Sequence, residues 1–520
     1  MLVQHFLEQS AARLADKVAL ICGDDRLTYL DVDSQSDSLA RYLRNLGVQR
    51  QDRVAILLDN SIASVISLFG ILKADAIFVI LSPTMKAPKL SYILNDCSVE
   101  VLITHPRKTR IVSKALANTP SVRHVVWVGQ ASAVPSLPTS EAQHHGFAQA
   151  LSAASYPPSP SPSSNIDMDL AAIIYTSGST GDPKGVMLTH LNMVSAATSI
   201  IGYLENQEDD IILNVLPLSF DYGLYQVLMA FKFGGTVVLE RSFGYPYKVI
   251  DKMVQEKVTG FPGVPTIFAI LLQLRDLKKY DFGSLRYITN TAAHLPVDFI
   301  NKLKDSFPHV RIFPMYGLTE CKRVAYLPPE QLESRPESVG KGMPNEEVWI
   351  VDEQGRPVGP HVVGELVVRG SNVMLGYWGL TEETDQVLRQ GTYPGEKALY
   401  TGDLFKMDQD GFLYFVGRKD DMIKTKGERI SPREIENCLH EMDGVVEAAV
   451  IGVPDHILGQ AIQAFVAFRD GYVAKERDII QHCRKNLEDF AVPKAVHCLD
   501  SLPKTPNGKI DKLALREMER

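Results

Sequence analysis

The sequence predicts an α/β protein with more than one domain, and two observations support this architecture. Short apolar runs at 53–58, 76–81 and 235–240 alternate with helical patterns through much of the chain, as in sheets of largely parallel strands covered by helices. At 520 residues, the chain is long enough for three to four domains of about 150 residues each. A Pro- and Ser-rich stretch at 155–164 predicts an extended connector between two lobes.

The pattern of elements changes twice toward the C-terminus. From 342 to 417, short strands separated by turns predict a β-rich subdomain. After Arg418 a mixed helix and strand pattern returns, and Ser431 followed by Pro432 favours a helix start, because serine caps helices and proline fits their first turn. A small α+β domain of about 100 residues is therefore expected at this end. The expected domains are residues 1–418, which include the β-rich part, and residues 419–520.

Composition and charge exclude several classes of function. Hydrophobic residues make up 45% and charged residues 22%, which is typical of a folded globular protein. The net charge of −8 gives no electrostatic reason to bind nucleic acid. The six cysteines are scattered without a CxxC pair, so we expect reduced thiols and a cytoplasmic protein. No signal peptide pattern and no apolar run of about 18 residues is found, so no membrane span is expected.

The most informative segment is 169–186. An apolar strand runs into Thr176-Ser-Gly-Ser-Thr-Gly181, whose small residues let the backbone approach an anion and whose N–H and hydroxyl groups can bond phosphate oxygens. This composition alone more often marks a plain flexible loop, but the preceding strand and the following Lys184 favour phosphate binding. The segment is not a Walker A loop, because Pro183 replaces the second glycine and Gly185 follows the lysine.

Five motifs in order carry a resemblance to a known superfamily. Tyr175-Thr-Ser-Gly-Ser-Thr-Gly-Asp-Pro-Lys-Gly185 resembles the ATP-phosphate loop of the adenylate-forming enzymes, which include acyl-CoA synthetases, luciferases and the adenylation domains of peptide synthetases. The further motifs are Tyr316-Gly-Leu-Thr-Glu320, Tyr400-Thr-Gly-Asp403, Gly417-Arg-Lys-Asp420 and Pro503-Lys-Thr-Pro-Asn-Gly-Lys509. The resemblance spans the chain and implies a large N-terminal domain with a distorted barrel, a small mobile C-terminal domain and a site between them.

The resemblance also implies the reaction and its cofactors. A carboxylate and ATP form an acyl-adenylate and pyrophosphate with Mg²⁺, and the acyl group then passes to a thiol. Because the two reactants are anions, the site needs cations and positioned hydrogen-bond donors. By similarity, the ATP-binding residues are Thr176, Ser177, Gly178, Ser179, Thr180, Gly181, Lys184, Tyr316, Gly317, Thr319, Glu320, Asp403, Arg418 and Lys509. The implied catalytic residues among them are Lys509, Thr176, Glu320 and Lys184.

Individual roles follow from the resemblance residue by residue. Thr176 and Glu320 help to place Mg²⁺, for which a hydroxyl and a carboxylate are suitable hard oxygen ligands. Thr319 is expected to reach the α-phosphate, Tyr316 to lie near adenine and Asp403 to accept from both ribose hydroxyls. Outside this family, Glu320 would be read as a solvated surface acid and Asp403 as a turn aspartate.

The resemblance assigns the remaining motif residues to the domain boundary. Arg418 is expected to reach the ribose or a phosphate, and Lys509 to bridge the attacking carboxylate and the α-phosphate, where a cation stabilises developing charge. Asp420 matches the hinge about which the C-terminal domain rotates, with Lys419 as the alternative pivot. Gly427 matches the thiolation tunnel, although a simple tight turn would also place a glycine here.

The acid-binding pocket is expected after the junction at 216–225. Asp221 falls where amino-acid-activating members place an aspartate that pairs with the substrate ammonium, and the alternative is that it caps the helix that follows. Arg323 is a departure from the family pattern that would either meet a second carboxylate in the pocket or face outward to a partner. The other expected wall residues are Tyr222, Tyr225, Val264, Asn290, Met315 and Val324.

Two acceptors are compatible with the motif after the expected hinge. Ile423-Lys-Thr-Lys-Gly-Glu-Arg-Ile-Ser-Pro432 resembles stand-alone enzymes that load carrier proteins, including prolyl-carrier-protein ligases, and also some acyl-CoA ligases. The leading hypothesis is a ligase that adenylates a small amino acid, with proline favoured, and transfers it to the phosphopantetheine of a separate carrier protein, as in nonribosomal peptide synthesis. The alternative is an AMP-forming acyl-CoA synthetase that joins a fatty, aryl or small organic acid to coenzyme A.

Overall fold

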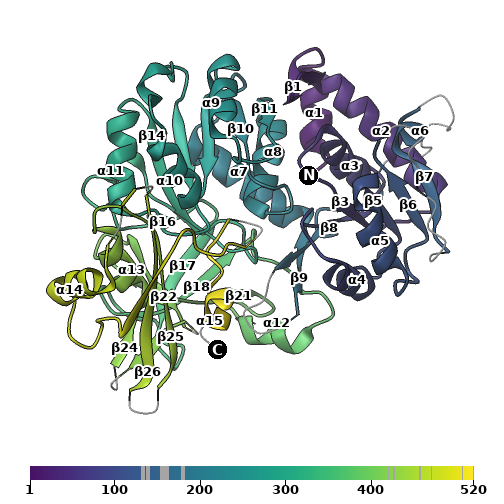
Figure 1. The fold of residues 1–520 in the computed structure, drawn as a ribbon. Coiled ribbons are helices and arrows are strands. Elements are labelled where there is room, and N and C mark those ends of the chain that lie inside the picture. Colours follow the sequence, from purple (N-terminus) through teal and green to yellow (C-terminus); the bar gives the residue numbers. More distant parts are fainter. Residues whose placement is uncertain are drawn as a thin grey trace.

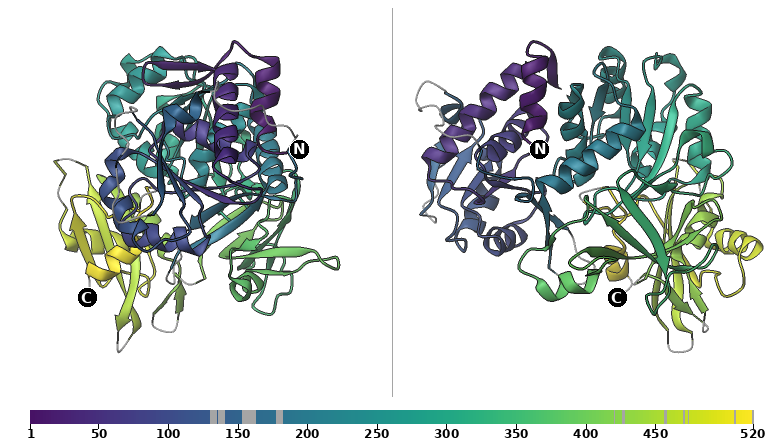
Figure 2. Two further views of the ribbon diagram at one scale, coloured as in Figure 1. Left: turned by 90° about the vertical axis from the view of Figure 1, so that its right-hand side faces the viewer. Right: turned by 180° about the vertical axis from the view of Figure 1, so that it is seen from behind.

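The structure, a computed structural model, confirms the expected fold class. It describes residues 1–129, 135, 141–152, 163–176, 182–419, 421–425, 428–455, 458–469, 471–472, 474–505 and 508–518. A main body of two helix-covered sheets adjoins an antiparallel sheet and a C-terminal unit of mixed helix and strand, which lies against one side of the body (Figure 1, Figure 2). Most of the predicted connector at 155–164 lies outside the described residues.

The first sheet of the main body is eight-stranded and carries the predicted phosphate loop at one edge. Its strand order is β19-β9-β8-β4-β3-β5-β6-β7, parallel from β8 to β7 and antiparallel at β9 and β19. In the β8–β9 pair, Thr176 lies opposite Lys184, so the two residues that flank the predicted loop are neighbours across the strand pair. The strands are β3 (Arg53–Leu57), β4 (Ile77–Ile80), β5 (Val101–Thr104), β6 (His124–Trp127), β7 (Gln143–Gly146), β8 (Leu170–Thr176), β9 (Lys184–Thr189) and β19 (Gly376–Tyr377).

The second sheet is nine-stranded, with the order β16-β15-β14-β13-β12-β10-β11-β1-β2. Its central strands β14 to β1 run parallel, so their carboxyl ends lie along one edge, where ligands of such sheets usually bind. The strands are β1 (Val18–Cys22), β2 (Asp25–Thr28), β10 (Ile211–Asn214), β11 (Thr236–Leu239), β12 (Gly260–Gly263), β13 (Tyr287–Asn290), β14 (Arg311–Tyr316), β15 (Ala325–Tyr326) and β16 (Lys341–Gly342).

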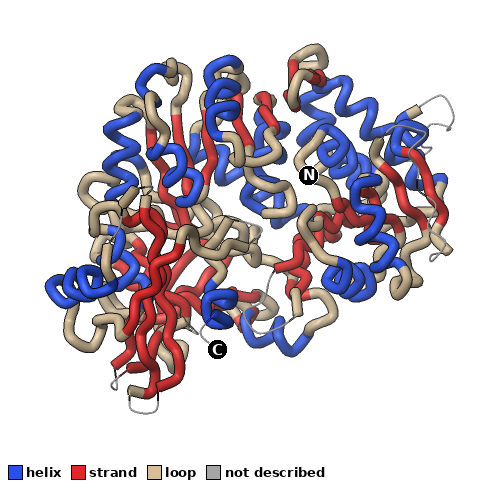
Figure 3. The backbone as a smooth tube through the Cα atoms, in the orientation of Figure 1, coloured by secondary structure: helices blue, strands red, loops and turns tan. Residues whose placement is uncertain are grey.

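A single hydrophobic core joins the two sheets through the helices that follow their strands. The helices α3 and α8 are apolar on nearly all sides, as expected for helices buried inside a large domain, and Figure 3 shows helices on the faces of the sheets. The helices are α1 (His5–Arg13), α2 (Tyr29–Asn45), α3 (Ile62–Lys73), α4 (Ala87–Asp96), α5 (Thr109–Leu116), α6 (Phe147–Leu151), α7 (His190–Leu204), α8 (Asp221–Phe233), α9 (Pro246–Gln255), α10 (Pro265–Gln273) and α11 (Val297–Ser306).

The antiparallel sheet follows the second sheet in the chain and covers most of the β-rich segment. Its order is β17-β18-β21-β20, with β22 on the free edge of β21. The β21–β22 register places Asp403 opposite Arg418, two residues that the sequence assigns to one nucleotide site. The elements are β17 (Glu346–Val351), β18 (Gly364–Gly370), α12 (Thr381–Val387), β20 (Leu388–Gln390), β21 (Lys397–Met407) and β22 (Leu413–Arg418).

The C-terminal unit, by which we mean β23 to β27 and α13 to α15, has its own core on each face of its sheet. The side chain of Ser431 accepts from the backbone N–H of Arg433, so serine caps α13 and Pro432 begins it, as the sequence predicts. The elements are β23 (Ile423–Thr425), β24 (Glu428–Ile430), α13 (Pro432–His440), β25 (Val445–Asp455), β26 (Gly459–Phe468), α14 (Glu476–Asn486), β27 (Ala495–Leu499) and α15 (Lys512–Met518).

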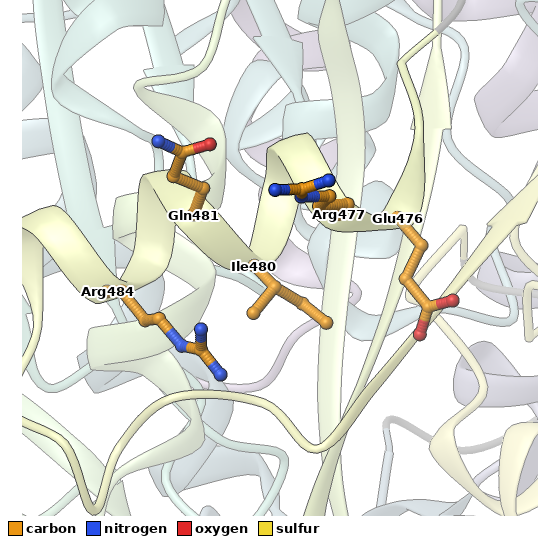
Figure 4. A pocket seen from close by; sticks show the side chains of 5 residues that line it. All are labelled: Glu476, Arg477, Ile480, Gln481 and Arg484. Atoms are coloured by element: carbon orange, nitrogen blue, oxygen red, sulfur yellow. The ribbon is translucent and has the colours of Figure 1, made fainter.

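Two properties of the described residues concern membranes and surface hollows. Within the described ranges, no helix is both long and apolar enough to cross a membrane. A shallow hollow lies along one face of α14, on the outer side of the C-terminal unit (Figure 1, Figure 4). Its lining residues are Glu476, Arg477, Ile480, Gln481 and Arg484. None of them belongs to the motifs above, so this hollow is not the site that the sequence predicts.

Candidate active site

Asp403 is a buried carboxylate that already has two partners. It lies on β21 with 3% of its surface exposed and accepts hydrogen bonds from the Tyr316 hydroxyl at 2.5 Å and from Arg418 Nε at 2.9 Å. Burial raises the pKa of Asp403, and the charge of Arg418 opposes that shift. Burial raises the pKa of Tyr316 well above its ordinary value, and the charge of Asp403 adds to the shift. The hydroxyl therefore keeps its proton and remains a donor. The structure therefore joins the motifs at Tyr316, Asp403 and Arg418.

Glu320 contacts a tyrosine that sequence reasoning missed. The Tyr377 hydroxyl donates to Glu320 Oε1 at 2.8 Å, and Lys184 Nζ lies 5.3 Å from the centre of the Tyr377 ring. Tyr377 reaches this place because β19 pairs with β9, where it lies opposite Val186. Burial, followed by the charge of Glu320, raises the pKa of Tyr377, which keeps its proton on the hydroxyl. No motif signals Tyr377 in the sequence, because its role depends on a strand pair only two residues long.

The loop after β14 folds back tightly on itself. A Cβ added at Gly317 would lie 2.4 Å from the carbonyl oxygen of Lys322, so only glycine fits this close approach. Thr319 and Glu320 lie in the same turn, half-buried. The other expected nucleotide contacts at 177–181, the hinge Asp420 and the tunnel residue Gly427 lie outside the described residues.

Lys509 lies at a hydrogen-bonded turn that contacts the main body. The Thr505 N–H donates to the Lys509 carbonyl at 2.8 Å, and the Gly508 N–H donates to the Thr505 carbonyl at 2.9 Å. The Thr266 hydroxyl on α10 donates to the Gly508 carbonyl at 3.4 Å, which seats the turn on the main body. Lys509 Nζ lies 6.0 Å from the centre of the Phe220 ring, directly before α8.

The charges around Lys509 are those of the predicted site. Loss of surrounding water lowers the pKa of Lys509, and the Asp221 carboxylate is the largest opposing influence. Arg418 lowers this pKa further, while Asp403 and Glu320 raise it. The Lys509 side chain nevertheless keeps contact with solvent. The structure therefore brings Lys509 of the C-terminal unit to the carboxylates of three separate motifs in the main body.

Asp221 is paired with an ammonium group from its own chain. Lys322 Nζ lies 3.3 Å from Asp221 Oδ2, and both residues are buried, with 3% and 8% of their surfaces exposed. The same ammonium lies 4.3 Å from the centre of the Tyr225 ring. Burial lowers the pKa of Lys322 to about 7, and Asp221 opposes the shift. The N-cap of α8 is Phe220, so Asp221 is the first helical residue and does not cap the helix.

The remaining expected wall residues gather at the carboxyl ends of the parallel strands. Val264 follows β12, Asn290 ends β13, and Met315 is the penultimate residue of β14. The Tyr222 hydroxyl contacts Thr289 Oγ1 at 2.6 Å. These residues are buried, as are Tyr225, Val324 and Arg323. The structure brings the set together at one sheet edge, and it adds Lys322, which lies between Cys321 and Arg323 in the sequence and was given no role there.

A polar contact fastens the C-terminal unit to the main body. Arg433 Nη2 on α13 lies 2.7 Å from His294 Nδ1, and Arg433 Nη1 donates to the carbonyl of Phe415. Burial lowers the pKa of His294 well below its ordinary value, and the charges of Arg433 and His440 add to the shift. Burial also lowers the pKa of Arg433, to about 10. His294 must be neutral at Nδ1 to accept this bond.

This contact predicts that docking of the C-terminal unit weakens in acid. Once Arg433 moves away, His294 regains a pKa of about 6.5 and takes up a proton below it, so the docked arrangement loses stability as pH falls through that value. In His294→Leu, Arg433 loses its acceptor, and we expect about a tenfold smaller docked fraction at pH 8 with little pH dependence. Energy transfer between dyes on α9 and α14 measures this fraction.

The exposed His309 provides the matched control for that experiment. Its ring contacts the Phe282 carbonyl within the main body, so His309→Leu removes a histidine without touching the interface. We expect His309→Leu to keep the wild-type profile of docking against pH. Equal profiles for wild type and His294→Leu would show that the contact does not control docking.

The donor set at this site suits a nucleotide with its magnesium ion. Glu320 offers a hard carboxylate oxygen, and Lys184, Arg418 and Lys509 offer the positive charge that a triphosphate needs. The arrangement is that of an enzyme that activates a carboxylic acid with a nucleotide, at the junction of two domains.

Comparison with known families identifies the class. The model of the AMP-binding enzymes matches residues 7–378, and the model of the AMP-binding enzyme C-terminal domain matches residues 434–509. The chain belongs to the AMP-binding enzyme family. It is an adenylate-forming ligase that uses ATP and Mg²⁺ to join an acid to a thiol.

Individual relatives agree over almost the whole chain. The long-chain-fatty-acid–CoA ligase of Bacillus subtilis (strain 168) is 34% identical over 541 residues, covering 99% of this chain and 94% of the relative. The feruloyl-CoA synthase of an Amycolatopsis species is 34% identical, covering 95% of this chain and 94% of the relative. The anthranilate CoA ligase AuaEII, solved with anthranoyl-AMP, matches with a TM-score of 0.90 at 28% identity, covering 100% of this chain and 97% of that one.

Proposed function

We propose that the enzyme is an acyl-CoA ligase: it adenylates a carboxylic acid without an α-amino group and transfers the acyl group to coenzyme A. The observation that carries this proposal is the buried contact between Asp221 and Lys322 at 3.3 Å. An amino-acid substrate would bring a second ammonium to a carboxylate that already has one. Its entry would place two positive charges at one buried anion, which is unfavourable. The contact therefore supports the alternative of the sequence analysis over proline and a carrier protein.

The relatives support the same acceptor. The three proteins named above are CoA ligases or a CoA synthase by name, and their acids are a long-chain fatty acid, an aryl acid and an amino-substituted aryl acid. In anthranilate the amino group lies on the aromatic ring. Acids without an α-ammonium group are therefore the class to test first.

In the first step, an oxygen of the substrate carboxylate attacks the α-phosphorus of ATP. A new P–O bond forms, the bond to pyrophosphate breaks, and pyrophosphate leaves with its electron pair. Lys509 supplies positive charge where negative charge grows, and Asp403, held by Tyr316 and Arg418, orients the ribose. Thr176 and Glu320 would hold Mg²⁺, which neutralises phosphate charge.

In the second step, the thiol sulfur of coenzyme A attacks the carbonyl carbon of the acyl-adenylate. A C–S bond forms, the C–O bond to AMP breaks, AMP leaves as the phosphate anion, and the thiol proton passes to solvent. In the arrangement described here, the turn that carries Lys509 contacts Thr266 and lies close to Phe220. This placement of Lys509 supports assigning the arrangement to the adenylation step, and we propose that the C-terminal unit turns near Asp420 before thiol transfer.

The test is acid-dependent exchange of labelled pyrophosphate into ATP, followed by mass spectrometry of products formed with coenzyme A. The panel contains aliphatic, aryl and dicarboxylic acids together with the amino acids. We expect exchange with acids that lack an α-amino group and formation of their CoA thioesters. Exchange with proline or another amino acid alone, without any CoA thioester, would overturn the proposal and return the carrier protein as acceptor.

A further inference from the structure

Arg323 is a buried cation without an anionic partner. Only 2% of its surface is exposed, and its Nε has no hydrogen-bond partner. Within the described part of the chain, no carboxylate lies at ion-pair distance from its guanidinium. The neighbouring carboxylate of Asp221 is in contact with Lys322. The carboxylate next to Lys322 is thus already occupied, and Arg323, the following residue, has no carboxylate of the described residues at ion-pair distance.

The guanidinium lies among residues of the acid pocket. Its Cζ is 5.2 Å from the centre of the Tyr222 ring on α8. By its charge and a hydrogen bond, Arg323 opposes the rise that burial causes in the pKa of Tyr203 on α7. The Tyr203 hydroxyl contacts Met315 Sδ of β14 at 3.0 Å. Arg323 thus points inward, where α7, α8 and β14 meet, which decides between the two orientations that the sequence left open.

The two cations available to a substrate flank the start of α8. Lys509 Nζ lies 6.0 Å from the centre of the Phe220 ring, the Phe220 and Tyr222 ring centres are 6.1 Å apart, and Arg323 Cζ lies 5.2 Å from the centre of the Tyr222 ring. A substrate whose carboxylate reacts beside Lys509 would have to extend past Phe220 and Tyr222 to reach Arg323. An acid with a negative group at that end would satisfy both cations.

A buried guanidinium favours an anionic partner. A guanidinium taken out of water is destabilising unless an anion and hydrogen bonds replace the water. Its planar fork of N–H donors matches a carboxylate in bidentate geometry, and the contact gains strength in a dry pocket. A substrate with only one carboxylate would leave Arg323 without an anionic partner.

We propose that Arg323 binds a second carboxylate of the substrate, so that the acid activated by this enzyme is a dicarboxylic acid. One carboxylate is adenylated beside Lys509, and the other pairs with Arg323. This inference rests on the acid-activating site of the proposed function, but it holds for any thiol acceptor.

The experiment compares acids of equal length with one or two carboxylates. The pairs are butyrate and succinate, valerate and glutarate, and hexanoate and adipate, each measured as kcat/KM for pyrophosphate exchange. At the preferred length we expect the wild type to favour the dicarboxylate by about 100-fold, because a buried cation discriminates strongly against an acid that leaves it unpaired. Arg323→Met should lose that preference, and Arg323→Lys should retain part of it.

Arg356→Met is the matched control. Arg356 lies on an exposed turn, pairs with Asp352 and is remote from the site, so its removal should leave the preference unchanged. The proposal is overturned if the wild type uses monocarboxylates as well as dicarboxylates at every length. It is also overturned if Arg323→Met keeps the wild-type preference.

A binding measurement separates this inference from the proposed function. Calorimetric titration of the three dicarboxylates and their monocarboxylate partners needs no turnover. Tighter dicarboxylate binding by the wild type, lost in Arg323→Met, supports the inference even if no CoA thioester forms. Formation of CoA thioesters from monocarboxylates alone, with no preferential dicarboxylate binding, supports the proposed function and refutes the inference.

Discussion

Replacement of Lys509 by methionine is expected to reduce acid-dependent pyrophosphate exchange by about 100- to 1,000-fold. Removal of one preorganised charge or donor from a transition state commonly has an effect of this size. Lys509 is the residue that the C-terminal unit places beside Phe220, among the charges of Asp221, Asp403 and Glu320. The measurement is the initial rate of exchange with a saturating acid, together with a melting curve that verifies folding.

Lys512→Met is the control for this prediction. Lys512 follows Lys509 by three residues, but its ammonium pairs with Glu436 of the C-terminal unit at 2.7 Å. Its removal is expected to leave exchange within about threefold of wild type, because half-exposed ion pairs contribute little. If Lys509→Met retained exchange at the level of Lys512→Met, the adenylation role of Lys509 would be refuted.

The second large effect is expected at the buried pair of Asp221 and Lys322. Removal of one member leaves the other charge buried without its partner, so Asp221→Asn or Lys322→Met should each lower the free energy of unfolding by about 3–5 kcal/mol at pH 6. The double variant should be much closer to wild type. The exposed pair of Asp298 and Lys302 gives the control cycle, with an expected coupling below about 0.5 kcal/mol.

The same pair predicts a dependence of stability on pH with a definite sign. Burial lowers the pKa of Lys322 to about 7, whereas the unfolded chain holds the proton up to about pH 10.4. Between these values the unfolded state binds more protons, so the contribution of Lys322 to the free energy of unfolding rises with pH, by at most about 1.4 kcal/mol per pH unit. Denaturant titrations from pH 6 to pH 10 should show this rise in wild type relative to Lys322→Met. Parallel curves for the two proteins would contradict the lowered pKa of Lys322.

The sequence predicted those parts of the site that depend on local order. The strand before Thr176 and the lysine after the loop are neighbours in the chain, and their pairing across β8 and β9 follows from that closeness. The Ser431–Pro432 start of α13 is equally local. Motif order extended the prediction to Asp403 and Arg418, which the structure joins at 2.9 Å.

The sequence could not predict contacts that depend on the distance between remote segments. Lys322 meets Asp221 across 101 positions of the chain, and neither residue identifies the other. Tyr377 reaches Glu320 only because a two-residue strand joins the edge of a sheet. We propose an acid without an α-amino group in place of proline, because Lys322 already pairs with the Asp221 carboxylate that a substrate amine would need.

Asp403 has a consequence for how the enzyme binds its nucleotide. Tyr316 and Arg418 fix both carboxylate oxygens by one bond each, and a carboxylate accepts about four, so acceptor capacity remains for two ribose hydroxyls. The side chain is therefore already ordered in the free enzyme. Binding avoids the entropy loss of about 0.5–1.5 kcal/mol that fixing a mobile side chain entails. On the proposed role of Asp403, the affinity for adenosine is thus set partly by a tyrosine hydroxyl and an arginine that need not touch the sugar.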